Sequence, residues 1–216
     1  MARVSQEHLD ARRRQILDGA ARLFARNGFH ATSMQDVLKE VDLSAGAVYR
    51  YFSGKDELIA AIVKEVLGEI RAAFADVTRQ SPPPPPDVLV GLVMGRTLRV
   101  WSSLSVADEP LLPRLIMQVW AETVRNEELA AVLADGYTEL RDSWVLAVEA
   151  YQDAGMMRSD IPADHVARTM IATAQGFVAH QALFGAAPVE VLQDGLRGLM
   201  SMPGGQSDES TGSQLG

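Results

Sequence analysis

Hydroxyl, aromatic and cationic residues gather in one segment of the chain, TSMQDVLKEVDLSAGAVYRYFSGK, which runs from Thr32 to Lys55. Side chains of these types are the ones that proteins use to contact phosphate oxygens and base edges. The segment also contains small residues, which allow the end of a helix to approach a polyanion closely. The pattern therefore predicts a DNA-contacting surface made of Thr32, Ser33, Ser44, Ala45, Gly46, Tyr49, Arg50, Tyr51 and Lys55.

Two short helices separated by a tight turn are expected to position these residues. A serine can cap each helix, and the helices are expected at residues 34–41 and 45–52. Val48 and Phe52 lie four residues apart on the side of the second helix that should be buried, so the contact residues are turned outward. In a helix–turn–helix a helix of this kind enters the major groove, where Arg50 would contact guanine.

The charge distribution supports a polyanion-binding head on an acidic body. The formal net charge of the chain is −8, but residues 1–55 hold nine Lys and Arg against six acids, a net of +3. The remaining residues hold eleven basic residues against twenty-two acids, a net of −11. The alternative, that both faces are simply solvated, remains open on charge alone.

The remainder of the chain reads as further helices. Apolar residues recur at helical spacing, strand alternation is absent, and the expected fold is all-α with about nine helices. The run of prolines from Pro82 to Pro86 is interpreted as a stiff connector, with a proline-recognition ligand as the weaker alternative. We expect a DNA-binding domain at residues 1–55, a helical effector-binding and dimerisation domain at 56–202, and a disordered tail at 203–216.

Composition excludes several classes of function. Cysteine is absent and the four histidines are scattered without a paired spacing, so we expect no metal site and no cofactor. No nucleophile motif, phosphate loop or dinucleotide fingerprint occurs, and we expect no catalytic residues. The N-terminus lacks a signal-peptide pattern and no long apolar run occurs, which favours a cytoplasmic protein without a membrane partner.

Three stretches of the N-terminal part resemble the DNA-binding domain of the TetR family of bacterial transcriptional regulators. They are ARLFARNGF at residues 21–29, FHATSMQDV at 29–37 and LSAGAVYRYFSGKDEL at 43–58. The resemblance implies an all-helical homodimer whose first three helices and the start of the fourth read DNA. Tyr49 and Lys55 match the phosphate-contacting positions of that family, and Ser44, Gly46 and Arg50 match positions of its recognition helix.

The family resemblance also implies a C-terminal domain that binds a small-molecule effector. Large apolar side chains on different expected helices are candidates for the lining of its pocket: Phe74, Met94, Trp101, Met117, Trp120, Tyr137, Trp144 and Phe177. The alternative is that these side chains simply fill a solid core. The last two helices are expected to form the dimer interface through His180, Gln181, Phe184, Leu192, Leu196 and Leu199.

The expected function is thus that of a ligand-responsive repressor. As a dimer it would bind a palindromic operator and be released by an apolar or aromatic effector. Two alternatives remain open at this point: an effector-independent or activating regulator, and a helical adaptor that does not bind DNA.

Overall fold

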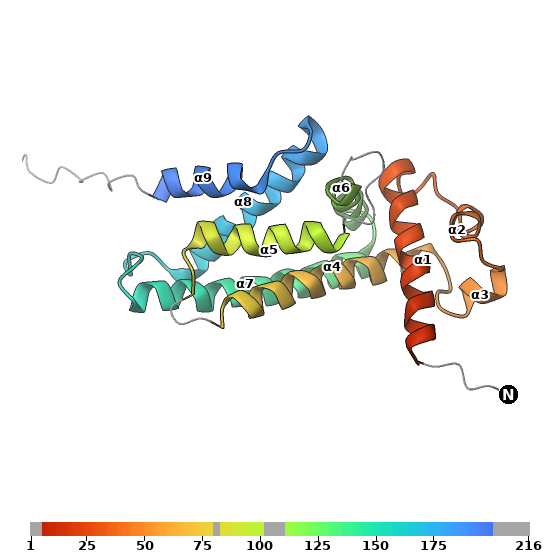
Figure 1. Cartoon of the computed structure of the whole chain (residues 1–216), viewed down its shortest axis with the longest axis horizontal. Coiled ribbons are helices and arrows are strands. Elements are labelled where there is room, and N and C mark those ends of the chain that lie inside the picture. Colours follow the sequence, from red (N-terminus) through yellow and green to blue (C-terminus); the bar gives the residue numbers. More distant parts are fainter. Residues whose placement is uncertain (1–5, 80–82, 102–110, 201–216) are drawn as a thin grey trace, which may run out of the picture.

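The computed structural model describes residues 6–79, 83–101 and 111–200, and within these residues it consists of nine α-helices and no strand (Figure 1). The helices are α1 (Gln6–Asn27), α2 (Met34–Val41), α3 (Ala45–Tyr49), α4 (Lys55–Val77), α5 (Pro86–Val100), α6 (Leu111–Thr123), α7 (Glu127–Asp153), α8 (Ala163–Phe184) and α9 (Val189–Met200). The predicted all-α class is confirmed. The expected tail at 203–216 lies outside the described residues.

Helices α1 to α3 form a small head at one end of the molecule, and α4 runs from this head into the body (Figure 1). Helix α2 begins with a capping box, in which the Ser33 hydroxyl accepts from the Asp36 N–H and the Asp36 carboxylate accepts from the Ser33 N–H. The Ser33 hydroxyl also donates to the Asp36 carboxylate at 2.6 Å, and this bond together with the one from the Ser33 N–H lowers the pKa of Asp36. Asp42 closes α2 in the left-handed conformation, with φ of 53°, which turns the chain toward α3.

Helix α3 ends at Tyr49, three residues earlier than the sequence predicts. The backbone N–H groups of Tyr51 and Phe52 both donate to the Val48 carbonyl oxygen, so the chain leaves the helix in a turn. That turn places Phe52 in the core, where it is 2% exposed. The buried positions of Val48 and Phe52 agree with the prediction, but a turn and not a continued helix brings Phe52 inside.

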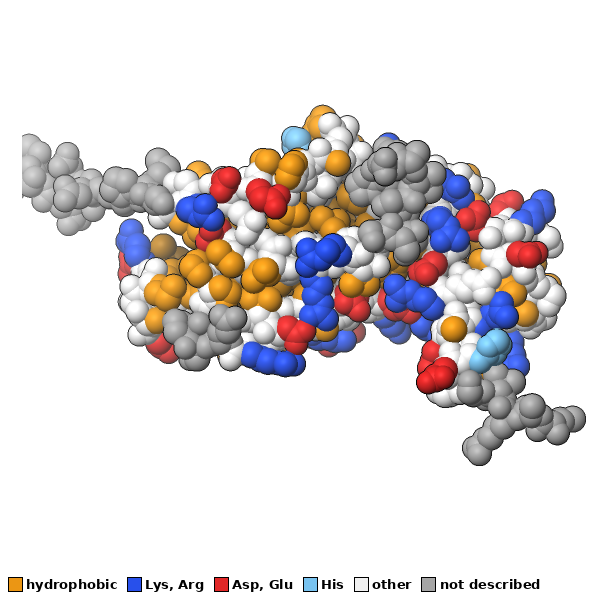
Figure 2. Space-filling view, viewed as in Figure 1, with side chains coloured by type: hydrophobic (Ala, Val, Ile, Leu, Met, Phe, Trp, Pro, Cys, Tyr) orange, Lys and Arg blue, Asp and Glu red, His pale blue; other side chains and the backbone are white. Residues whose placement is uncertain are grey.

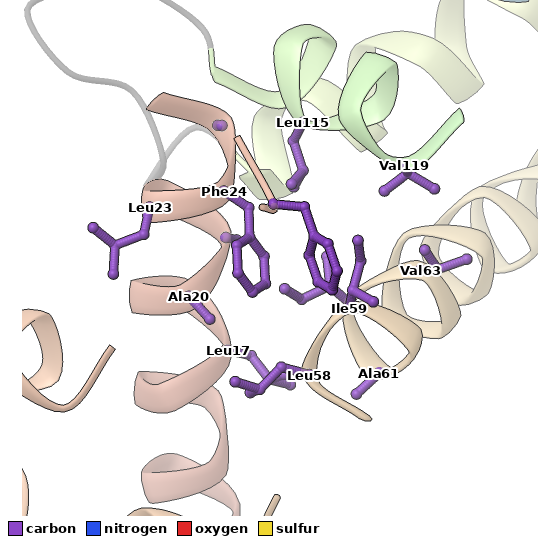
Figure 3. Close-up of a cluster of buried hydrophobic side chains, with 14 of the residues drawn as sticks. Leu17, Ala20, Leu23, Phe24, Leu58, Ile59, Ala61, Val63, Leu115 and Val119 are labelled. Atoms are coloured by element: carbon purple, nitrogen blue, oxygen red, sulfur yellow. The ribbon is translucent and has the colours of Figure 1, made fainter. Parts of the chain in front are cut away.

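The head is held on the body by a shared hydrophobic cluster. Leu17 and Phe24 of α1 meet Leu58 and Ile59 of α4, and Leu115 of α6 closes the cluster from the body side (Figure 3). All five side chains are almost completely buried. Helix α1 is therefore packed between its partner α2 on one side and α4 and α6 on the other. The predicted boundary between residues 55 and 56 falls at the start of α4, and this first cluster crosses it.

The close packing of α1 on α2 depends on one glycine. A Cβ atom at Gly19 would lie 2.4 Å from Cγ1 of Val41, a branched side chain that is itself buried. Only glycine therefore permits this separation of the two helices.

A second hydrophobic cluster fills the body, where α4, α5, α7, α8 and α9 pack side by side. Arg197 of α9 binds the buried carboxylate of Asp87 of α5, with Nε 3.0 Å and Nη2 2.9 Å from Oδ2. The Tyr151 hydroxyl donates to the Pro84 carbonyl oxygen and thereby fixes the chain before α5 to α7. Burial and the Asp87 charge raise the pKa of Tyr151. Pro86 is the first residue of α5. Proline is tolerated there because the N–H group that it lacks would have no acceptor within the helix.

Candidate DNA interface, ligand cavity and dimer face

Helix α3 presents a mostly exposed surface at the far side of the head. Ser44 caps the helix, since its hydroxyl accepts from the Ala47 N–H at 3.4 Å. Tyr49 is 49% exposed, and Ala45, Gly46 and Arg50 are exposed as well. Among the described residues Arg50 forms no ion pair, so its guanidinium is free for a partner outside the chain.

Two of the predicted contact residues lie elsewhere. Thr32 is 1% exposed and its hydroxyl donates to the Gly28 carbonyl oxygen at 2.8 Å, which contradicts the expectation of a hydroxyl available to phosphate. The physical reason is that the chain turns inward between α1 and α2, and the hydroxyl binds the carbonyl oxygen of Gly28, the first residue after α1. Tyr51 is partly buried against the first cluster, so it packs between helices and is not fully available to DNA. Ser33 is exposed, and its hydroxyl is engaged in the cap of α2.

Lys55 is fixed at the first position of α4. Its Nζ donates to the Phe29 carbonyl oxygen at 3.0 Å and lies 4.7 Å from the centroid of the Phe29 ring. The turn before it is fixed by Glu57, whose carboxylate accepts from the N–H and the hydroxyl of Ser53 at 2.7 and 2.8 Å. These two bonds lower the pKa of Glu57. The amine of Lys55 is thus oriented by Phe29, at the start of the helix that follows the turn after α3.

Ion pairs neutralise many of the cations that the sequence places in the head. Arg13 and Arg14 bind Glu65 of α4 at 2.6 and 3.1 Å. Arg22 and Arg26 bind Glu40 at 2.9 and 3.0 Å. Partial burial raises the pKa of Glu40, but the hydrogen bonds and charges of the two arginines outweigh it and lower the pKa overall. The net charge of the head therefore overstates how many cations are available, whereas Arg50 and Lys55 remain at the α3 edge.

The body contains an apolar cavity of about 570 Å³. Helices α4, α5, α6, α7 and α8 all contribute to its wall, so it lies at the junction of the two hydrophobic clusters. Of the predicted lining residues, the structure brings together Phe74, Met94, Trp120, Tyr137 and Trp144. Phe74 and Trp144 stack edge to face, with ring centroids 5.1 Å apart.

Three predicted lining residues are not part of the cavity wall. Trp101 is 2% exposed in the first cluster, with the Arg14 guanidinium 5.2 Å from its ring centroid, so it joins α5 to the head. Met117 lies on the side of α6 opposite to Leu115 and Val119, which line the cavity. Phe177 packs against the second cluster. Residue type predicted all three, but the rotation of each helix decides which side chains reach the cavity.

Arg141 and much of the aliphatic lining of the cavity were not predicted from the sequence. Arg141 lines the cavity from α7, and no pattern of residues around it in the sequence indicates this. Ile62, Val63 and Val66 of α4 follow the ordinary helical spacing of core residues. Only the packing of five helices around one space distinguishes these residues from residues of a solid core.

Helices α8 and α9 carry an apolar surface that is not covered by the chain itself. Figure 2 shows hydrophobic side chains gathered over the region of α5, α8 and α9. Phe184 is 75% exposed with its ring centroid 4.9 Å from that of His180, and Leu199 is 69% exposed. Further exposed side chains on this dimer face, as we name it, are Leu183, Val191 and Met200. Large apolar groups exposed together are typical of a protein–protein interface.

Half of the predicted interface residues point inward. Leu192 and Leu196 are 8% and 7% exposed and belong to the second cluster, and Gln181 is 8% exposed. They therefore do not form the dimer face, contrary to prediction. The reason is that α9 has two apolar sides: one packs on α5 of the same chain, and the other, with Val191 and Leu199, stays exposed.

The described residues contain neither a metal-binding cluster nor a helix that could span a membrane. Residues 6–79, 83–101 and 111–200 contain no group of three or more metal-ligating side chains. Within the same ranges no helix combines the length and apolarity that crossing a bilayer requires.

Two family models match the chain. Residues 16–62 match bacterial regulatory proteins of the tetR family, and residues 106–199 match the C-terminal domain of BetI-type transcriptional repressors. The HTH-type transcriptional repressor Rv1474c of Mycobacterium tuberculosis is 28% identical over 174 residues, covering 76% of this chain and 79% of that protein. Relatives of this kind are named as transcriptional regulators and not as enzymes.

Solved structures share the fold. GusR of Salmonella enterica superposes with a TM-score of 0.68 at 26% identity, covering 93% of this chain and all of that one. FadR of Bacillus subtilis in complex with stearoyl-CoA has a TM-score of 0.69 at 16% identity, covering 87% and 96%. A regulator of Saccharomonospora viridis in complex with choline has a TM-score of 0.70 at 21% identity, covering 88% and 96%. The helix–turn–helix head, the helical body and both family models show that this chain belongs to the TetR family of bacterial transcriptional regulators.

Proposed function

We propose that this regulator is a ligand-responsive repressor that binds a palindromic operator as a homodimer and is released from it by a small apolar or aromatic effector. The observation that carries the proposal is the cavity of about 570 Å³, because the helix that supplies much of its wall, α4, begins with Lys55 at the DNA-facing edge. A volume of this size is typical of small-molecule sites. The space beside Trp120 and Trp144 favours this reading over an effector-independent regulator with a solid core.

Two helices connect the cavity to the head. Val63 of α4 and Val119 of α6 line the cavity and also belong to the first cluster, which holds α1. Helix α6 makes a second contact with the head through the buried carboxylate of Glu122, whose Oε2 lies 3.0 Å from Nε2 of His30. A ligand that moves α4 or α6 would therefore change the orientation of the head, and differential binding to two head orientations is what allosteric release requires.

A symmetric dimer through the dimer face would explain both the exposed apolar side chains and a palindromic site. A Cβ atom at Gly195 or Gly198 of α9 would meet no atom of the rest of the chain within 4 Å, which leaves room for a second chain to approach closely. Two-fold symmetry presents two α3 helices at a fixed separation, and paired half-sites lie about 34–36 Å apart or a multiple of this. The operator DNA of a bacterium lies in the cytoplasm, so we propose that location for the protein.

The nature of the effector is supported by the cavity wall, which consists mainly of aliphatic and aromatic side chains. A ligand that fills it would gain most of its affinity from apolar burial. The stearoyl-CoA and choline of the two ligand-bound structures belong to those proteins; they support the proposal only in that two proteins of this fold bind small molecules.

The proposed DNA contacts of Arg50 and Lys55 predict different effects for two substitutions. Arg50→Ala is expected to lower the ratio of operator to random-sequence affinity by about tenfold, because a base contact is lost. Lys55→Met is expected to weaken binding to all sequences and to reduce the slope of log affinity against log salt by about one. Fluorescence anisotropy with an operator selected from a random DNA library, at several salt concentrations, measures both.

Lys64→Met is the matched control. Lys64 is an exposed lysine of the same helix, but it lies further along α4, away from the start of the helix. It should leave both quantities unchanged. Wild-type behaviour of both head variants would contradict the assignment of α3 and Lys55 to the DNA interface.

If the repressor responds to a ligand in the cavity, a side chain that fills the cavity should prevent the ligand from lowering the affinity for the operator. Ala130 lines the cavity from α7, and its neighbour Ala131 is exposed and outside the cavity. Ala130→Trp should keep operator affinity within about threefold but lose the roughly tenfold or larger release that a bound effector causes. Operator complexes titrated with decanol, decanoate and naphthalene test this, with Ala131→Trp expected to behave as wild type. Equal release of all three proteins would show that the ligand acts elsewhere.

A further inference from the structure

We propose that Arg141 binds the anionic head group of an amphipathic effector whose apolar chain occupies the cavity. This inference rests on the proposed function, and it names the chemical class of the ligand: a medium or long alkyl or alicyclic chain that ends in a carboxylate or a phosphate ester.

The charge of the cavity wall is the first argument. Arg141 is the only charged side chain among the described residues that line the cavity, and no carboxylate lines it. A cation at the edge of an apolar space favours an anionic ligand, because a charge that leaves water needs a partner of opposite sign. A cationic ligand would meet repulsion from Arg141 at the same place.

The other polar groups of the wall leave few alternatives for a head group. The hydroxyls of Thr97, Thr123 and Thr138 each donate to the carbonyl oxygen four residues earlier, at 2.9, 2.8 and 3.0 Å. Gln175 of α8 is exposed and remains as a neutral donor and acceptor. Tyr137 also lines the cavity, and its hydroxyl is hydrogen-bonded to Arg168. Arg141 and Gln175 are therefore the groups of α7 and α8 best suited to hold a polar head.

The position of these residues matches a ligand that enters chain first. Ala134, Thr138 and Gln175 line the cavity and are exposed, so the opening lies between α7 and α8. The opposite wall, on α4 and α6, consists of buried aliphatic side chains such as Val63 and Leu115. An alkyl chain would reach this buried wall, and its head group would remain at the opening.

The Arg141 guanidinium has the capacity for such a partner. Nε and Nη2 lie 3.2 and 2.8 Å from Oδ1 of Asp142, and Nε lies 3.6 Å from Oδ1 of Asp164. The Asp142 side chain is 60% exposed, so solvent screens its ion pair with Arg141. Asp164 lies closer to Arg168, at 2.7 Å, and is therefore shared between the two arginines. In the described part of the chain Nη1 has no hydrogen-bond partner. Since the Arg141 side chain is 28% exposed, an anion at the opening would meet a partly desolvated, planar donor suited to bidentate binding.

The test compares four probes with the same ten-carbon chain: decanoate, decyl phosphate, decan-1-ol and decylamine. Affinities are measured on the full-length protein by calorimetry and by the fluorescence of Trp120 and Trp144, which line the cavity. The wild type should bind one of the two anions about tenfold more tightly than decanol, and decylamine least. Preference for decanoate identifies a carboxylate ligand, and preference for decyl phosphate identifies a phosphate ester.

Arg141→Met should abolish the preference for the anion while decanol still binds, because methionine keeps the apolar stem and removes the donor. Arg71→Met is the matched control: it removes an exposed arginine of α4 that pairs with Glu139 of α7 and does not line the cavity, so it should retain the preference. Thermal unfolding of each variant confirms that it is folded. The proposal is overturned if the wild type binds decanol as tightly as both anions, if both variants lose the preference equally, or if no probe binds.

These outcomes are distinguishable from failure of the proposed function. Equal binding of anion and alcohol with release of the operator would remove the role of Arg141 and leave the ligand-responsive repressor intact. An anion preference that depends on Arg141, without any change in operator affinity, would retain the anion site and contradict ligand-responsive repression.

Discussion

Phe184→Asp is expected to convert the regulator from a dimer into a monomer and to lower its affinity for the operator about a hundredfold. The Phe184 ring is 75% exposed in the isolated chain and belongs to the dimer face, where it is the last residue of α8. A carboxylate at this position would be desolvated in a symmetric interface, next to its own two-fold copy or close to it. Loss of the second half-site contact removes the gain from bivalent binding, which amounts to about 10²–10⁴ in affinity.

Sedimentation velocity and anisotropy on the selected operator measure the two effects. Leu146→Asp is the matched control. Leu146 is likewise a large apolar residue with high exposure, 68%, but it belongs to α7 and lies outside α8 and α9. The control should remain dimeric and bind the operator as the wild type does. A dimeric Phe184→Asp protein with unchanged operator affinity would show that the two chains associate through another surface.

Phe24→Ala is expected to destabilise the protein by about 3–5 kcal/mol, the usual cost of removing a fully buried phenylalanine ring. Phe24 is 0% exposed and lies where α1, α4 and α6 meet (Figure 3). Its ring centroid is 5.3 Å from that of Phe29, the residue whose carbonyl oxygen and ring hold Lys55. The variant should therefore lose operator affinity at temperatures where it is still mostly folded, because the support of Lys55 is loosened.

Urea unfolding followed by circular dichroism measures the loss of stability. Val124→Ala, at a position that is 86% exposed, should change the free energy of unfolding by less than about 0.5 kcal/mol. A Phe24→Ala variant within about 1 kcal/mol of the wild type would mean that the head and body are held together elsewhere than at this junction.

The accuracy of the sequence predictions varied with how local the determining interaction is. Ser33 and Ser44 were predicted as helix caps and are found as caps, because a cap depends on residues within one turn. Helix α8 likewise begins directly after Pro162 and ends directly before Gly185, and both residues are local signals of a helix boundary. By contrast Thr32, adjacent to a correct cap, was wrongly predicted to be free, since its partner is the carbonyl oxygen of Gly28, the residue that follows α1.

The body shows the same division over longer distances. The apolar pattern of α9 identified a helix with Leu192, Leu196 and Leu199 on it, but it did not indicate which leucines face the chain's own core. Trp101 has the residue type of a pocket residue, yet it packs against Arg14 in the head. The orientation of one helix against another depends on shape complementarity among side chains far apart in the sequence, which a periodic pattern in one helix does not encode.

The sequence by itself determined the all-α class, the helix–turn–helix segment and the family, because these depend on caps, turns and a spacing of residues along one short stretch. Only the tertiary structure decided that Arg13 and Arg14 are bound by Glu65, that five helices leave a cavity, and that Arg141 lies at its opening. Each of these requires two or more helices at a particular separation and rotation. The segment from Thr32 to Lys55 thus identifies a DNA-binding protein, and the packing of α4 to α8 forms the cavity on which the proposed ligand response depends.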